Sequence, residues 1–97
     1  MKAVFIAFDQ AHKDAVMETL NHLNCRGFSF IEQMQGRGSK TGEPHYGSHA
    51  WAAMNSGIIT VVEDNIVASL LTTLKKIDES SPMLGLRAFV WNIEQCY

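Results

Sequence analysis

Residues 57–77, GIITVVEDNIVASLLTTLKKI, join a strand pattern directly to a helix pattern. The first seven of them are rich in β-branched side chains, which are enriched in strands. From Asp64, a residue type that caps helices well, apolar side chains recur at helical spacing. The expected inner face of this helix comprises Ile66, Val67, Leu70, Leu71, Leu74 and Ile77. This stretch therefore predicts a strand followed at once by an amphipathic helix.

The start of the chain has the same order of patterns. Residues 2–8 form a continuous apolar run, typical of a strand covered on both faces or at a subunit contact. Asp9 is a plausible cap for a helix that ends before Gly27, and His12 and His22 are expected on its exposed side. Its apolar positions at helical spacing are Ala11, Ala15, Val16, Leu20 and Leu23. A second strand–helix unit is therefore predicted.

Two more strands are expected, at residues 28–35 and 86–93, with Phe89 and Trp91 on one face of the latter. The resulting order predicts an α+β, ferredoxin-like βαββαβ fold, in which a four-stranded antiparallel sheet carries both helices on one face. The other face would then meet solvent or another subunit, and its apolar residues favour another subunit. We expect one domain over residues 1–97, with residues 36–57 as the loop between the second and third strands.

The composition describes a small, weakly acidic chain of 97 residues, 46% of them apolar, with a formal net charge of −2. A chain this short has little core in reserve, so an oligomer is expected. The charge argues against a nucleic-acid partner. The N-terminal apolar run is too short to span a membrane and lacks a cleavage site, and two cysteines do not make a disulfide framework. We expect a cytoplasmic protein with no direct membrane insertion.

The loop at residues 36–57, GRGSKTGEPHYGSHAWAAMNSG, is longer than an ordinary hairpin connection and is the first candidate for a binding site. Its start combines glycines with Arg37 and Lys40, and consecutive backbone amides in such a segment can form an anion-binding concavity. The spacing is not that of a phosphate-binding Walker motif. A hairpin tip without a ligand is the alternative interpretation.

His45 and His49, with Glu43 nearby, form half of a metal site, because imidazole is a common ligand for zinc, copper and nickel. The alternative is that both are polar loop residues, since no CxxC or HExxH pattern accompanies them. There is no Ser/His/Asp arrangement and no paired-carboxylate pattern. We therefore expect a protein that is not an enzyme.

Three short matches, in order and spacing, make the chain resemble the nitrogen-regulatory PII-like superfamily. KAV at residues 2–4 opens the chain as a strand. CRGFSFIE at residues 25–32 leads into GRG at residues 36–38, similar to the family's glycine after the first helix and its Gly-x-Gly before the T-loop. RAFV at residues 87–90 stands where the family has Lys-Ile-Phe-Val in its last core strand.

The resemblance implies a homotrimer with ligand clefts between subunits, which in the classical family bind ATP or ADP together with 2-oxoglutarate. It also implies that the T-loop contacts a regulated partner, such as a membrane transporter. Carried over by position, the ligand-binding residues would be Gly27, Gly36, Arg37, Gly38, Lys40 and Arg87, the last offering a cation to phosphates.

Two departures from the family pattern indicate a divergent member. The T-loop is shortened, and LGLR at residues 84–87 replaces the phosphate-binding B-loop, Gly-Asp-Gly-Lys. The leading expectation is a non-enzymatic regulatory trimer with a changed ligand, for which an adenine nucleotide is the first candidate. The alternative is a metal-responsive protein, similar in architecture to the trimeric cation-tolerance proteins, with His45 and His49 binding a divalent or copper ion.

Overall fold

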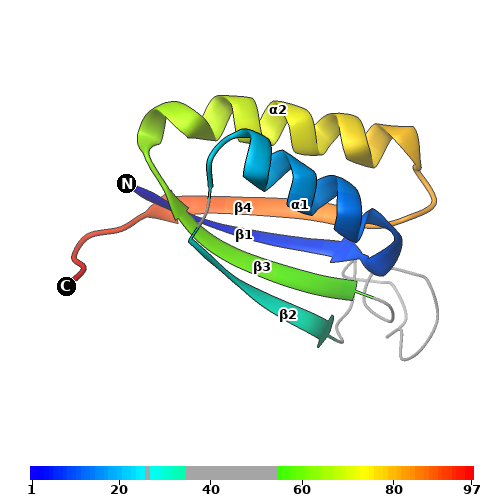
Figure 1. Ribbon diagram of the computed structural model, residues 1–97, viewed down its shortest axis with the longest axis horizontal. Helices are drawn as coiled ribbons and strands as arrows, with labels where there is room; N and C mark the ends of the chain where they lie inside the picture. Colours follow the sequence, from blue (N-terminus) through cyan, green and yellow to red (C-terminus); the bar gives the residue numbers. More distant parts are fainter. Residues whose placement is uncertain (26, 35–54) are drawn as a thin grey trace, which may run out of the picture.

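The computed structural model describes residues 1–25, 27–34 and 55–97. These residues form four strands, a short 3-10 helix and two α-helices (Figure 1): β1 Lys2–Asp9, η1 Gln10–His12, α1 Lys13–His22, β2 Phe28–Met34, β3 Asn55–Val62, α2 Asp64–Ser80 and β4 Leu86–Asn92. The strands make one sheet in the order β2-β3-β1-β4, and every neighbouring pair is antiparallel. The predicted ferredoxin-like βαββαβ fold is confirmed. The third strand begins at Asn55, two residues earlier than predicted.

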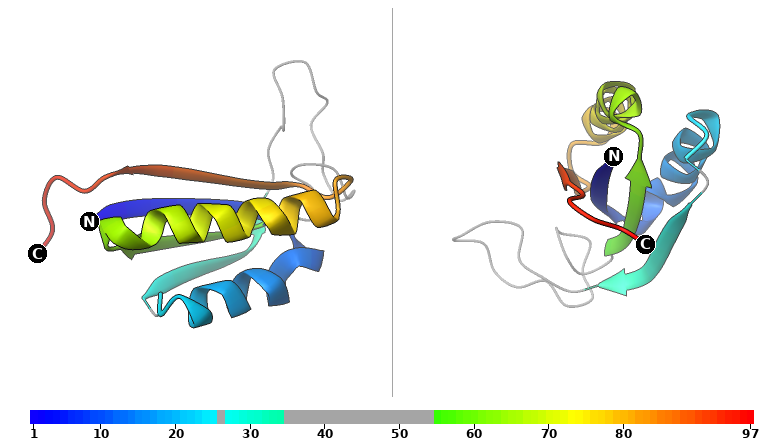
Figure 2. Two further views of the ribbon diagram at one scale, coloured as in Figure 1. Left: turned by 90° about the horizontal axis from the view of Figure 1, so that it is seen from above. Right: turned by 90° about the vertical axis from the view of Figure 1, so that its left-hand side faces the viewer.

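Both helices cover the same face of the sheet, as the end-on view in Figure 2 shows. Alternate residues of the central strand β1, Val4, Ile6 and Phe8, point to that face and are fully buried. They pack with Val16 and Leu20 of α1, Ile58 of β3, and Leu70 and Leu74 of α2. Each fully buried side chain of this size contributes roughly 1.5–3 kcal/mol, so this layer holds the chain together.

The two residues that were predicted to cap helices behave differently. Asp9 does cap, accepting a hydrogen bond from the backbone N–H of Ala11 at 2.9 Å, but the turn it caps is η1. Asp64 is the first residue of α2 rather than its cap. Its carboxylate lies 3.0 Å from the amino group of Met1, and this hydrogen bond and charge hold the pKa of Asp64 below its usual range. The side chain of the residue that precedes it, Glu63, makes no capping bond.

The burial of the helix faces follows the prediction in part. His22 is exposed as expected, but His12 is buried, with 5% of its surface exposed. A 3-10 turn has three residues per turn instead of 3.6, so η1 rotates His12 out of the phase that the α-helical pattern assumed. Ala11 and Ala15 are exposed, and Leu71 is also more exposed than predicted, at 36%, because α2 presents only its Leu70–Leu74 stripe fully to the sheet.

The face of the sheet opposite the helices, here called the open sheet face, is apolar, and no helix or strand among the described residues covers it. It carries large half-exposed side chains: Ile31 of β2, Ile59 and Val61 of β3, and Phe89 and Trp91 of β4. Phe5 of β1 and Phe89 stack across strands, with ring centroids 6.5 Å apart. Phe89 and Trp91 therefore share one face, as predicted. No helix within the described residues has the length and apolar character needed to cross a bilayer.

Candidate functional site

The two predicted site residues that the structure describes, Gly27 and Arg87, lie on opposite edges of the sheet. Gly27 directly precedes β2, whereas Arg87 is the second residue of β4, and β2 and β4 are the two edge strands. Pairing aligns Phe28 through the central strands with Val90, three residues beyond Arg87. Strand spacing then separates Gly27 from Arg87 by roughly 15–20 Å in the plane of the sheet. One phosphate cannot reach both within a single chain.

The remaining predicted site residues lie outside the described part of the chain. They are Gly36, Arg37, Gly38 and Lys40 of the proposed ligand site and His45 and His49 of the alternative metal site. Their roles stay predictions. In the described ranges, no group of three or more His, Cys, Asp or Glu side chains is close enough together to hold a metal ion.

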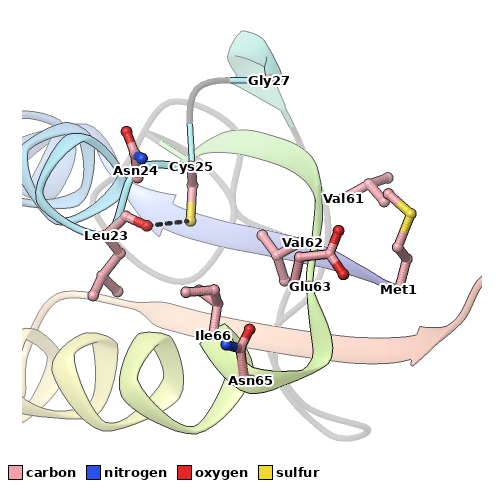
Figure 3. Close-up of a pocket in the computed structure, with 10 residues that line it drawn as sticks. All are labelled: Met1, Leu23, Asn24, Cys25, Gly27, Val61, Val62, Glu63, Asn65 and Ile66. Atoms are coloured by element: carbon pink, nitrogen blue, oxygen red, sulfur yellow. Dashed lines mark hydrogen bonds between the residues drawn. The ribbon is translucent and has the colours of Figure 1, made fainter.

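A cavity of about 740 Å³ opens beside Gly27, where the end of α1, the end of β3 and the start of α2 meet (Figure 3). A side chain at Gly27 would meet no atom within 4 Å, so the backbone here is open to a ligand. Thr60 donates a hydrogen bond to the carbonyl of Gly27 at 2.7 Å and fixes its position. The cavity is lined by Met1, Leu23, Asn24, Cys25, Gly27, Val61, Val62, Glu63, Asn65 and Ile66.

The described walls of this cavity suit an uncharged group better than a phosphate. Leu23, Val62 and Ile66 supply apolar surface, and the carboxylate of Glu63 would repel an anion. Among the described residues that line the cavity, the one cation is the amino group of Met1, which is paired with Asp64. This part of the cavity can therefore hold the uncharged body of a ligand, while a charged part would need a cation beyond these residues.

The thiol of Cys25 sits in the wall of the cavity, within 3.9 Å of the carbonyl oxygen of Leu23 (Figure 3). Burial raises the pKa of Cys25, which keeps the sulfur protonated and makes it a poor nucleophile and a poor metal ligand at neutral pH. The preceding residue, Asn24, has a φ of 64°, a left-handed conformation that turns the chain from α1 toward β2. Cys25 is therefore a structural part of this wall.

Arg87 supplies a cation at the other end of the sheet. It is exposed and, within the described residues, forms no salt bridge. It borders a smaller hollow of about 200 Å³ beside α2, but it alternates with Phe89 along β4, which puts its side chain on the open sheet face. An exposed guanidinium on this face suits an anionic group such as a phosphate.

The sequence did not reveal the cavity, because its wall is assembled from three separate segments of the chain. The one sequence feature that pointed to this region was Gly27, the glycine after the first helix, and its role as a ligand residue came from the family resemblance. The sequence also gave no indication that two polar side chains are buried here, Asp9 at the end of β1 and His12 at the end of η1.

The comparisons with known proteins agree with this architecture. The sequence model of the family "Nitrogen regulatory protein P-II" matches residues 1–97. Curated proteins give no match. Among solved structures, the chain is similar to CPII, a nitrogen regulatory PII-like protein from Thiomonas intermedia K12, with 22% identity and a TM-score of 0.70 over 92% of this chain and 86% of that one. That structure of CPII is bound to ADP, AMP and bicarbonate.

Two further solved structures have the same fold. A candidate PII-like signalling protein from Thermus thermophilus is 22% identical, with a TM-score of 0.64 over 95% of this chain and 85% of that one. A DUF3240 family protein from Shewanella baltica is 17% identical, with a TM-score of 0.68 over 99% of this chain and 93% of that one. At these identities the likeness concerns the fold alone.

Proposed function

Because this chain belongs to the nitrogen regulatory protein P-II family, we propose that it is a non-enzymatic signalling protein that works as a homotrimer. In this proposal each trimer binds a small ligand in the clefts between its subunits, and an adenine nucleotide is the first candidate. Ligand binding changes the affinity of the loop at residues 36–57 for a regulated partner protein, such as a membrane transporter.

The observation that carries the proposal is the separation of Gly27 and Arg87 on a sheet with an apolar open face. Within the described residues, a single chain offers a cavity with apolar walls at one edge of the sheet and the exposed guanidinium of Arg87 at the other. Association through the open sheet face would bury Phe89 and Trp91, which are 52% and 49% exposed in the single chain. It would also bring the Arg87 edge of one subunit toward the Gly27 edge of the next.

The ligand chemistry follows from what each edge supplies. An adenine ring is uncharged and can pack against Leu23, Val62 and Ile66 in the cavity beside Gly27, and the phosphates need the cation that Arg87 supplies. Gly36, Arg37, Gly38 and Lys40 come directly after β2 in the sequence and are proposed to complete the phosphate contacts. CPII from Thiomonas intermedia, which has this fold, binds ADP, AMP and bicarbonate, so these three are the first ligands to test.

The role of the loop rests on its position between β2 and β3, next to the proposed phosphate contacts. A ligand that contacts the start of the loop can change the conformations available to the rest of it. The partner then recognises the loop in one ligand state and not in the other.

Calorimetry and mass measurement on the full chain test the proposal together. We expect a trimeric mass by light scattering, and saturable binding of ADP, AMP or ATP in the presence of bicarbonate. Arg87→Ala should weaken nucleotide binding. Lys76→Ala is the control, because Lys76 is an exposed cation of α2 that lines neither the cavity beside Gly27 nor the hollow beside Arg87, and it should leave binding unchanged. A monomer at all concentrations, or a trimer that binds none of these ligands at millimolar concentration, would contradict the proposal.

A further inference from the structure

Two buried polar side chains at the end of β1 each have one atom without a hydrogen-bond partner. Asp9 and His12 are both 5% exposed. Within the described residues, Oδ2 of Asp9 and Nε2 of His12 make no hydrogen bond. Buried polar atoms are bonded in the large majority of cases, so two such atoms within four consecutive residues call for an explanation.

The carboxylate of Asp9 is held by the bonds that this residue does make. Its Oδ1 accepts a hydrogen bond from the backbone N–H of Ala11 at 2.9 Å. Its own backbone N–H donates to the carbonyl of Gly85, also at 2.9 Å, which ties the end of β1 to the segment before β4. One carboxylate oxygen is thereby fixed as the cap of the turn, and the other is held in place without a hydrogen-bond partner among the described residues.

His12 stands three residues after Asp9, at the end of the 3-10 turn that Asp9 caps. A cap residue and the third residue of the turn that it caps lie close enough for the side chain of each to reach the backbone of the other. Asp9 and His12 are therefore one turn apart, a spacing that a single bound ion can bridge.

No cation of this turn is available to pair with the carboxylate. The adjacent Lys13 extends the other way, with its ammonium 5.0 Å from the centre of the Phe30 ring on β2. An ionised carboxylate oxygen can only accept a hydrogen bond, and a neutral imidazole with its proton on Nδ1 offers Nε2 as a second acceptor. A hydrogen-bond donor or a metal cation that lies between two such acceptors would satisfy both.

We propose that Asp9 and His12 are two ligands of a binding site for a divalent transition-metal cation. A carboxylate oxygen combined with an imidazole nitrogen suits zinc, cobalt, nickel and copper, and a magnesium or calcium site would use oxygen alone. The described residues contribute two donors, so the remaining coordination positions are taken by water or by donors elsewhere. The site lies at the end of β1, apart from the cavity beside Gly27.

The test is zinc and cobalt binding to the full chain after treatment with EDTA, followed by calorimetry and by the visible absorption of bound cobalt. Asp9→Asn keeps an oxygen for the Ala11 cap but removes the charge, and His12→Gln removes the imidazole. We expect each to weaken zinc binding at least tenfold. The control His22→Ala removes an exposed histidine at the end of α1 and should leave zinc binding unchanged.

A second measurement needs no variant at His12 and so does not depend on how well that variant folds. In the wild-type chain, the Nε2 nitrogen resonance of His12 should shift on addition of zinc, while that of His22 stays in place. An unshifted His12, or unchanged binding in Asp9→Asn and His12→Gln, would overturn the proposal. Loss of binding only in the double variant His45→Ala with His49→Ala would overturn it too, and would assign the metal to the loop.

Discussion

The two faces of the sheet differ in what they need from outside the chain. The face under α1 and α2 is closed, with Val4, Ile6 and Phe8 of β1 fully buried. The open sheet face is equally apolar, yet Phe89 and Trp91 remain about half exposed. Burial of the first face stabilises the folded subunit, and the second face is suited to contact another subunit. The predictions that follow test this division, from the largest expected effect to the smallest.

The largest effect is expected on the closed face. Leu70 is fully buried between α2 and the sheet, so Leu70→Ala should destabilise the chain by about 2–5 kcal/mol through lost burial and the cavity left behind. The neighbouring Leu71 is 36% exposed, and Leu71→Ala is the matched control, with an expected loss below about 1 kcal/mol. Chemical denaturation measures both. Equal losses would mean that the closed face is wrongly assigned.

A smaller effect on folding, but a larger one on assembly, is expected on the open sheet face. Trp91→Glu places a charge in the proposed subunit contact and should weaken association by about 2 kcal/mol or more. Met83→Glu, at an 83% exposed residue before β4, is the control and should leave the mass unchanged. Light scattering gives the mass, and circular dichroism checks that the subunit stays folded. A Trp91→Glu protein with unaltered mass would remove the open face from the assembly.

The smallest effect concerns chemical reactivity and involves no change in stability. Burial raises the pKa of Cys25, so little thiolate forms near neutral pH, whereas Cys96 is exposed at the end of the chain. Iodoacetamide should therefore label Cys96 at least tenfold faster than Cys25 in the folded protein. Mass spectrometry of the peptides follows both sites in one sample. Equal rates would mean that the wall of the cavity beside Gly27 opens readily.

The element types could be predicted from the sequence because local patterns determine them. The β-branched run before Asp64 and the helical spacing of Leu70 and Leu74 predict the same elements that the structure contains. The errors occur where a distant group or a small change of phase intervenes. The amino group of Met1 takes the carboxylate of Asp64, and the 3-10 turn buries His12.

The candidate site was less predictable, because it depends on pairing between distant parts of the chain. The family resemblance assigns Gly27 and Arg87 to one ligand site. The sequence contains no local signal for the strand order that separates them. The apolar residues of the open sheet face did predict contact with another subunit. Which residues such a contact would bring together follows from the register of the strands.

The most direct test of the central claim is complementation between two impaired subunits. Gly27→Trp places a large side chain at the wall of the cavity, where a Cβ would meet no atom within 4 Å, and Arg87→Ala removes the cation at the other edge. Each variant alone should bind ADP much more weakly than the wild type. After the two are unfolded together and refolded, mixed trimers should regain a fraction of the sites, because an intact Gly27 edge can then meet an intact Arg87 edge. If the mixture binds ADP as weakly as the separate variants while the wild type treated in the same way binds it normally, the ligand site is not shared between subunits.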